Sequence, residues 1–212
     1  MRIPLLLLIG AIPAISQPIS FGVKAGVPLT DFLSTVESPN FGFNSTTNRY
    51  IIGPTVELHL PFGFGIEFDA LYRHLNYTGT TNLVDAINQI NTSSGVWEFP
   101  LLAKYRFRGK LVRPFVSAGV AWDTLSGLSQ TITTTVFPSN IKSTTTTSNP
   151  AELNHSTTTG FVTGAGLDVH VLLVHISPEV RYTRWGAQHF LSSNGGLSSN
   201  QNQAEFLLGI TF

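Results

Sequence analysis

The residues that could carry out acid–base or nucleophilic chemistry are few, and they include the six histidines and the serines near them. His189 is followed by Ser192, Ser193 and Asn194, a grouping that could indicate a serine nucleophile activated by a histidine base. Two residues separate His189 from Ser192, and this spacing would not present both groups on one face of a strand. A plain polar loop is therefore the favoured interpretation, and no catalytic residue is predicted.

Three other histidines, His59, His170 and His175, fall at one end of the strands predicted below and could meet there. Imidazole nitrogens bind zinc and related metals, but they also serve as ordinary hydrogen-bonded interior groups. The second interpretation is favoured, so neither a metal nor a cofactor is expected. Cysteine is absent from the chain, which excludes disulfides, thiol catalysis and cysteine metal sites.

The composition favours a single all-β domain. Charged residues make up 11% of the 212 residues and the formal net charge is zero, so there is no basic field to hold nucleic acid. The chain has 19 glycines, 15 phenylalanines and long Ser/Thr/Asn tracts, whereas no stretch has the periodicity of a long helix.

The N-terminus has the pattern of a secretory signal. Met1 and Arg2 precede an apolar stretch from Ile3 to about Ile15, and the small residues Ala14 and Ser16 lie just before Gln17. We therefore expect residues 1–16 to be a signal peptide and residues 17–212 to form the domain. The apolar stretch is shorter than the roughly 20 residues that a spanning helix needs.

Alternating apolar and polar residues predict eight strands, each about as long as a tilted strand that crosses a bilayer. The predicted strands cover residues 18–27, 49–60, 63–75, 95–107, 112–124, 159–171, 173–185 and 203–212. Tight turns are expected near residues 61–63, 108–111 and 172. The other connections, 28–48, 76–94, 125–158 and 186–202, are long and polar, and the third is predicted to be a mobile, low-complexity loop.

One face of these strands carries no charge, whereas the other carries most of the charges in the chain. This pattern favours an antiparallel up-and-down transmembrane β-barrel, because an Arg or Lys that faces lipid at mid-bilayer costs roughly 2 to 4 kcal/mol. The polar network predicted to fill the lumen consists of Lys24, Glu57, Glu67, Asp69, Arg73, Glu98, Lys104, Arg106, Asp123, Asp168, Glu179, Arg181 and Glu205.

A soluble lipocalin-like barrel would show the same two faces inverted, and the aromatic residues argue against that alternative. They fall into two levels, as the interfacial girdles of a membrane barrel do. The girdle is predicted to include Trp97, Trp122, Tyr72, Tyr182, Tyr105 and Phe107, with Tyr50, Tyr77 and Trp185 near the loop side and Phe62 and Phe212 near the turn side.

Four prolines, Pro54, Pro100, Pro114 and Pro178, lie within predicted strands, although a closed barrel has no free edge for a residue without an N–H. We expect β-bulges at these positions. A bulge would also explain why Arg184 and Trp185 are exchanged between the two faces in the predicted alternation.

Four segments resemble those of a known family. They are the strand from Trp97 to Leu102, the segment from Arg113 to Val120, the strand from Pro178 to Trp185 and the closing segment from Phe206 to Phe212. The chain resembles the small eight-stranded outer-membrane β-barrel domains of Gram-negative bacteria, such as the OmpA transmembrane domain and OmpX- and OmpW-like proteins. The resemblance covers nearly all of the mature chain.

The resemblance implies an outer-membrane location, with outer-membrane lipid and lipopolysaccharide as surroundings. It also implies that the barrel-assembly machinery reads a terminal signal, here Phe206, Leu208, Ile210 and Phe212. The predicted function is non-enzymatic: a structural protein or one that binds an unknown surface ligand through its outer loops. A lipid A-modifying enzyme of the deacylase type and a narrow pore are the alternatives.

Overall fold

The structure, a computed structural model, describes residues 18–36, 41–45, 49–171, 174–192 and 195–212. The predicted signal peptide, residues 1–16, lies outside the described residues. The strands are β1 (Ile19–Pro28), β2 (Leu33–Thr35), β3 (Phe41–Ser45), β4 (Ile51–His59), β5 (Phe64–Asp69), β6 (Leu71–Asn82), β7 (Ala86–Arg106), β8 (Val112–Val136), β9 (Ile141–Thr147), β10 (Thr157–Val171), β11 (Val174–Trp185), β12 (Leu197–Ser199) and β13 (Asn202–Thr211). One short 3-10 turn, η1 (Pro61–Gly63), precedes β5. Among the described residues, no helix is both long and apolar enough to cross a membrane.

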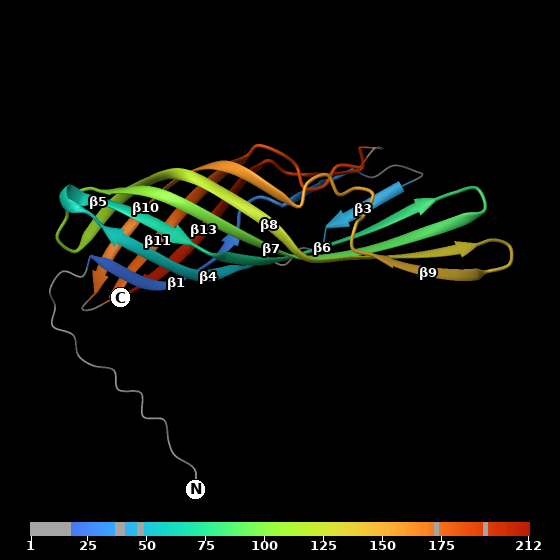
Figure 1. The fold of residues 1–212 in the computed structure, drawn as a ribbon, viewed down its shortest axis with the longest axis horizontal. Coiled ribbons are helices and arrows are strands. Elements are labelled where there is room, and N and C mark those ends of the chain that lie inside the picture. The colour runs from blue at the N-terminus through green and yellow to red at the C-terminus, as the bar shows by residue number, and fades with distance from the viewer. Residues whose placement is uncertain (1–17, 37–40, 46–48, 172–173, 193–194) are drawn as a thin grey trace, which may run out of the picture.

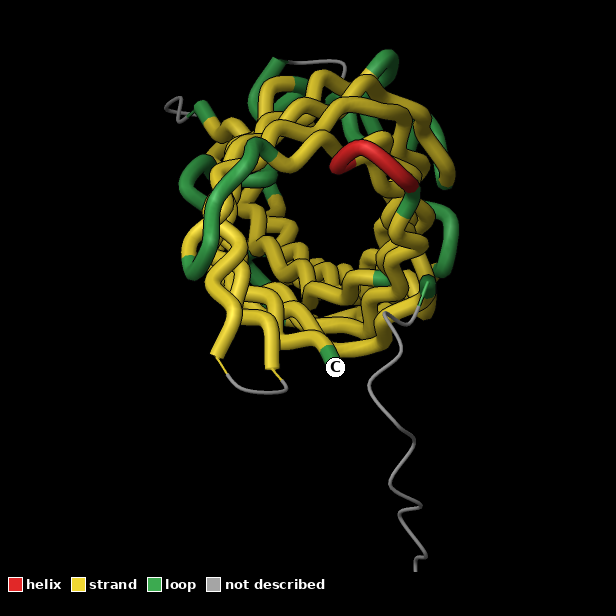
Figure 2. Tube along the Cα trace, turned by 90° about the vertical axis from the view of Figure 1, so that its left-hand side faces the viewer, coloured by secondary structure: helices red, strands yellow, loops and turns green. Residues whose placement is uncertain are grey.

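The sheet closes into a barrel because the first strand pairs with the last. Gly22 of β1 lies opposite Thr211 of β13, and antiparallel pairing continues to Pro28 and Glu205. Around the ring the order is β1, β4, β5 with β6, β7, β8, β10, β11 and β13, so each strand lies beside its neighbour in sequence. Figure 2 shows this ring end-on, and Figure 1 shows it from the side. The predicted fold class, an eight-stranded antiparallel up-and-down barrel, is confirmed.

Strands β5 and β6 occupy one position in the ring and are separated by Ala70. Both keep the same register against β4, with Thr55 opposite Asp69 and Ile52 opposite Tyr72. At the gap, the Ala70 N–H donates to the Pro54 carbonyl at 3.0 Å. Pro54 has no N–H to return that bond, which accounts for the break.

The expected bulges at the four prolines are wrong. Pairing runs through Pro54, Pro100, Pro114 and Pro178 without a register shift. A missing hydrogen bond within an otherwise continuous ladder is therefore tolerated at each proline. In β11, alternation also continues to the end of the strand, so Arg184 faces outward and Trp185 inward with no bulge between them.

A bulge does occur, at Gly127 of β8. The pairing of β7 with β8 shifts between Ser93 and Gly95, and Gly127 has a φ of 61°, which glycine adopts without strain. Before the bulge in the chain, even-numbered β8 residues such as Trp122 face outward. After the bulge, odd-numbered residues such as Thr131 lie on the outward face, opposite Asn91 of β7.

Two of the predicted long loops are wrong. Residues 76–94 form an extended β6–β7 hairpin that turns at residues 83–85. Most of residues 125–147 are strand, because β8 continues to Val136 and then pairs with β9. Threonine is a good strand former, and these tracts obtain backbone partners from their neighbours, so they need not remain loops. Both hairpins project beyond the barrel on the right of Figure 1.

Candidate functional site

The middle of the lumen is occupied by a cluster of buried charges from three strands, β1, β5 and β11. Lys24 Nζ contacts Glu67 and lies 3.3 Å from Asp69 and 3.1 Å from Glu179. Arg181 Nη2 lies 3.2, 3.0 and 3.1 Å from carboxylate oxygens of Glu67, Asp69 and Glu179. Lys24 and Arg181 are 2% and 0% exposed, so two cations bind three carboxylates where water is excluded.

The network continues toward the turn end of the barrel. Lys104 Nζ lies 2.7 Å from Glu67 and 3.3 Å from Glu57. Arg106 contacts Glu57, and its Nε donates to Asp168 at 2.9 Å. Each carboxylate in this part of the lumen therefore has a cation close by, as a buried carboxylate requires.

Toward the loop end the charges are sparser. Arg73 Nη2 lies 3.4 Å from Glu98, and Arg181 Nη1 lies 4.0 Å from Glu205. Asp123 accepts hydrogen bonds from the Thr158 hydroxyl at 2.7 Å and the Thr158 N–H at 3.2 Å.

All of the residues predicted to form the lumen network are buried in the barrel interior. They are Lys24, Glu57, Glu67, Asp69, Arg73, Glu98, Lys104, Arg106, Asp123, Asp168, Glu179, Arg181 and Glu205. The opposite face carries exposed apolar residues at every position of the ring, for example Phe21, Val120 and Val180. The side chains thus lie as a membrane barrel requires, with charges inside and apolar groups outside.

The predicted girdle residues lie in two groups of contacting rings. At the loop side, Tyr72 packs on Trp97 with ring centroids 5.2 Å apart, and Trp122 lies 6.1 Å from Phe99. At the turn side, Tyr105 lies 5.1 Å from Phe107.

Tyr182 is also exposed on the outer face, and its hydroxyl donates to Asn202 at 2.7 Å. The placement of Tyr77 and Trp185 in the girdle is wrong. Both are inward-facing and at most 2% exposed, because their strand positions share the face of the lumen charges.

The closing strand β13 directs Phe206, Leu208 and Ile210 outward, and Phe212 follows the end of the strand; all four side chains are exposed. Phe212 exchanges two backbone hydrogen bonds with Phe21, at 2.9 and 3.3 Å, which joins the end of the chain to β1. Their role as an assembly signal remains a prediction.

An apolar cluster covers the loop-side end of the lumen, and we call it the outer cap. It consists of Phe32, Leu33, Phe43, Leu75, Tyr77, Val96, Phe190 and Leu197. The connections predicted as polar loops supply most of it, since β2 pairs with β12 and β3 pairs with β6. This cluster is not predicted from the sequence, although large apolar residues within polar segments were the available signal.

Tyr77 links the outer cap to a polar group of side chains beneath it. Its ring lies 5.4 Å from that of Phe190, and its hydroxyl accepts a hydrogen bond from Gln130 at 3.4 Å. Burial raises the pKa of Tyr77 to about 12, so the phenol stays neutral.

His189 does not have the surroundings of a catalytic base. Its Nε2 lies 2.9 Å from Asp123, and its Nδ1 lies 2.7 Å from the backbone carbonyl of His155. A serine hydrolase needs one imidazole nitrogen facing the serine. Here both nitrogens face other oxygens and the side chain is 3% exposed. Ser192 Oγ accepts a hydrogen bond from the Leu197 N–H, and Ser193 and Asn194 lie outside the described residues.

The structure does bring His59, His170 and His175 together at the turn end. The ring of His175 lies 4.4 Å from that of His170 and 6.4 Å from that of His59. Within the described ranges, no group of three or more His, Cys, Asp and Glu residues is arranged to hold a metal ion.

The outward face of the projecting hairpins changes chemistry beyond the girdle. There the exposed side chains are hydroxyls and amides in facing pairs across β6, β7, β8 and β9, such as Asn91 with Thr131 and Thr133 with Thr144. A hollow of about 450 Å³ on this face is lined by Thr78, Gly79, Thr80, Gln89, Ile90, Asn91, Thr131 and Thr133. We call this surface the hydroxyl face.

The sequence pattern of a family described as "Outer membrane protein beta-barrel domain" matches residues 15–186. The chain belongs to this family. It is therefore a barrel of the bacterial outer membrane, with its apolar face toward lipid and its charges in the lumen. No curated protein sequence matches the chain.

Several solved structures are similar to this barrel. Neisserial surface protein A is 11% identical, with a TM-score of 0.43, and the match covers 92% of this chain and 96% of that one. Ail, the attachment invasion locus protein of Yersinia pestis, is 10% identical, with a TM-score of 0.38, and 91% and 94% of the two chains are covered. The N-terminal barrel domain of Pseudomonas aeruginosa OprF is 19% identical, with a TM-score of 0.33, and 91% and 97% are covered.

Proposed function

We propose that this outer-membrane barrel is a non-enzymatic anchor that presents the hydroxyl face to bind a neutral saccharide at the cell surface. The observation that carries the proposal is that the barrel strands β6, β7 and β8 continue past the girdle into the projecting hairpins that form the hydroxyl face. Strand β8 has 25 residues, whereas about 9 to 11 suffice to cross the bilayer. At roughly 3.3 Å per residue, about half of its length is available outside the membrane.

The composition of this sheet supports an uncharged ligand. In the strand segments 76–82, 86–94, 125–136 and 141–147, Lys142 is the one charged residue. Hydroxyl and amide groups both donate and accept hydrogen bonds, as sugar hydroxyls do. The 450 Å³ hollow also lies within the roughly 300–1,000 Å³ typical of small-ligand sites.

The position of the hydroxyl face supports a saccharide rather than a protein. It is the continuation of the lipid-facing surface, so beyond the girdle it lies beside whatever covers the membrane lipids. In the outer leaflet those neighbours are the sugars of lipopolysaccharide, the partner that the family resemblance implies. A rigid array of alternating donors and acceptors can recognise such a surface without a deep cleft.

Two alternatives are less well supported by the geometry. The packed lumen network and the outer cap argue against a narrow pore, since eight strands enclose a space just wide enough for side chains. The surroundings of His189 argue against a serine-dependent lipid A enzyme. Bilayer conductance would reveal a pore, and mass analysis of lipid A with and without expression would reveal an enzyme.

Binding of the folded protein to an array of bacterial surface saccharides tests the proposal. The variant Thr131→Val with Thr133→Val keeps the side-chain shape but removes two hydroxyls from the hollow. We expect it to lose most of the binding, at roughly 1 kcal/mol or about fivefold per hydrogen bond. Ser143→Ala, on the opposite face of β9, is the matched control and should bind like the wild type. Equal binding by all three proteins, or none by the wild type, would refute the proposal.

A further inference from the structure

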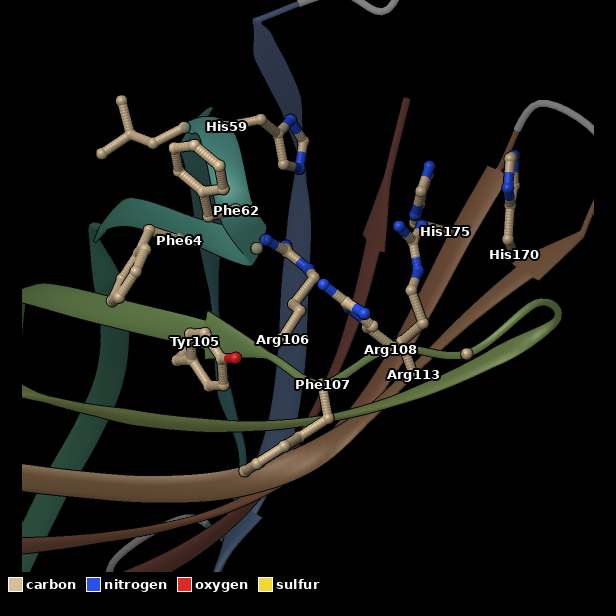
Figure 3. A pocket seen from close by; sticks show the side chains of 13 residues that line it. His59, Phe62, Phe64, Tyr105, Arg106, Phe107, Arg108, Arg113, His170 and His175 are labelled. Carbon is tan, nitrogen blue, oxygen red and sulfur yellow. The ribbon is translucent and has the colours of Figure 1, made fainter.

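A second site lies at the other end of the barrel, far from the hydroxyl face. It is a pocket of about 920 Å³ at the turn-side mouth of the lumen (Figure 3). Its walls come from β4, η1, β5, β7, β8, β10 and β11, so it belongs to the closed ring rather than to a single loop. In Figure 3, Phe62, Phe64 and Tyr105 lie on one side of Arg106, and His175 and His170 lie on the other.

The lining of this pocket is cationic. It includes Arg106, Arg108 and Arg113 together with three histidines, and no carboxylate is among the lining residues described. The two nearby acids, Glu57 and Asp168, lie behind the lining as part of the lumen network.

These two acids hold the basic groups in place without neutralising all of them. Arg106 is bound between Glu57 and Asp168. His175 Nδ1 lies 3.0 Å from Asp168, and Arg113 Nη2 is more distant, at 3.8 Å from the same carboxylate. Four charged or titratable groups thus share two carboxylates, once the contact of His59 with Glu57 at 3.9 Å is included.

Two arginines keep donors for a ligand. Arg113 Nε is buried and has no hydrogen-bond partner among the described residues. A buried donor without an acceptor costs free energy, and an acceptor atom of a ligand would remove that cost. Arg108 is exposed at the start of the turn between β7 and β8, and it forms no ion pair with a described residue. Both arginines therefore have unused capacity on the same pocket.

We propose that this pocket binds a phosphate group. Arginine donors match phosphate oxygens in charge and geometry, and imidazoles can add further donors. The surplus positive charge opposes a metal ion.

The phosphate could belong to a soluble phosphate compound or to a phospholipid headgroup. The turn-side girdle is continuous with the pocket, and Phe62 at its rim is 92% exposed, so an acyl chain would have an apolar surface beside the anion.

The test uses the folded full-length barrel in a neutral detergent at low ionic strength. Titration calorimetry with inorganic pyrophosphate reports a soluble ligand, and native mass spectrometry with added phosphatidylglycerol reports a lipid headgroup. The variants Arg113→Gln and Arg108→Gln remove one donor group each, whereas Lys142→Gln removes the same charge at the opposite end of the molecule. Heat-modifiable gel migration checks that each variant is folded.

We expect the wild type to bind at least one of the two probes and each arginine variant to bind it at least ~10-fold more weakly, with Lys142→Gln unchanged. Binding of pyrophosphate identifies a soluble phosphate compound as the ligand source, and binding of phosphatidylglycerol alone identifies the lipid headgroup. Should Arg113→Gln fail to fold, Arg108→Gln decides, because its side chain supports no ion pair in the described barrel. The proposal is overturned if the wild type binds neither probe, or if the arginine variants bind as tightly as Lys142→Gln.

Discussion

Replacing Arg181 by methionine tests whether the lumen charges act as one balanced network. Arg181 lies within 3.2 Å of three carboxylates, and it is 0% exposed. Without it, Asp69 and Glu179 would share Lys24 as their cation, and Glu67 would depend on Lys24 and Lys104. Removing one partner from a buried ion pair costs about 3 to 5 kcal/mol, which is a roughly hundred- to several-thousand-fold fall in the folded-to-unfolded ratio.

The assay is urea unfolding of the barrel in lipid vesicles, with heat-modifiable gel migration as the measure of the folded fraction. Arg184→Met is the matched control, because Arg184 is on the outer face and should change stability by no more than ~1 kcal/mol. The double variant Arg181→Met with Glu179→Gln removes one charge of each sign. It should be less destabilised than Arg181→Met alone, with a coupling of roughly 0.5 to 3 kcal/mol. An unfolding midpoint for Arg181→Met equal to that of the wild type would refute the reasoning, since it would mean that the carboxylates do not need this cation.

Four further predictions concern the membrane and its two sides. Val120→Arg, which places a charge toward lipid, should weaken insertion by roughly 2 to 4 kcal/mol, and equal insertion of variant and wild type would contradict the assignment of the outer face. Ser117→Arg, on the lumen face, should act by crowding instead. Deleting Phe212 removes two backbone hydrogen bonds to β1 and should lower the yield of heat-modifiable protein in the outer membrane; an undiminished yield would show that the residue is incidental. A membrane-impermeant amine reagent added to intact cells should label Lys142 on β9 and spare Lys110 in the turn, whereas the reverse pattern would mean that the barrel is inverted.

The ring and its two faces could be predicted because a two-residue period determines which side chains share a surface. Each predicted strand corresponds to one position in the ring. The charges predicted to fill the lumen all point inward. The pairing partners of the loops could not be predicted in the same way. The Thr-rich segment at 144–147 has no alternating pattern of its own, and it becomes a strand because Gln130 to Thr133 offer a matching edge.

The positions of β-bulges in the barrel strands could not be predicted from the sequence either. Proline suggested bulges at four positions, whereas the real bulge lies at a glycine, because a positive φ rather than a missing N–H permits the extra residue. The turn-side pocket was anticipated as a meeting of His59, His170 and His175. The arginines beside them were not connected to it, since they come from a turn and two strands whose relative positions depend on closure of the ring.

The bulge at Gly127 interrupts the pairing of β7 and β8, but it does not interrupt either chain, and both run from the membrane to the outer sheet as single strands of 21 and 25 residues. A pull on the tip of the sheet would therefore pass along covalent backbone into the ring. There the hydrogen bonds lie perpendicular to the strands, so tension along a strand loads many of them in shear at once instead of opening them one after another. Under the proposed function, the barrel would act as a mechanical tether, because the hydroxyl face and the membrane anchor share the same strands.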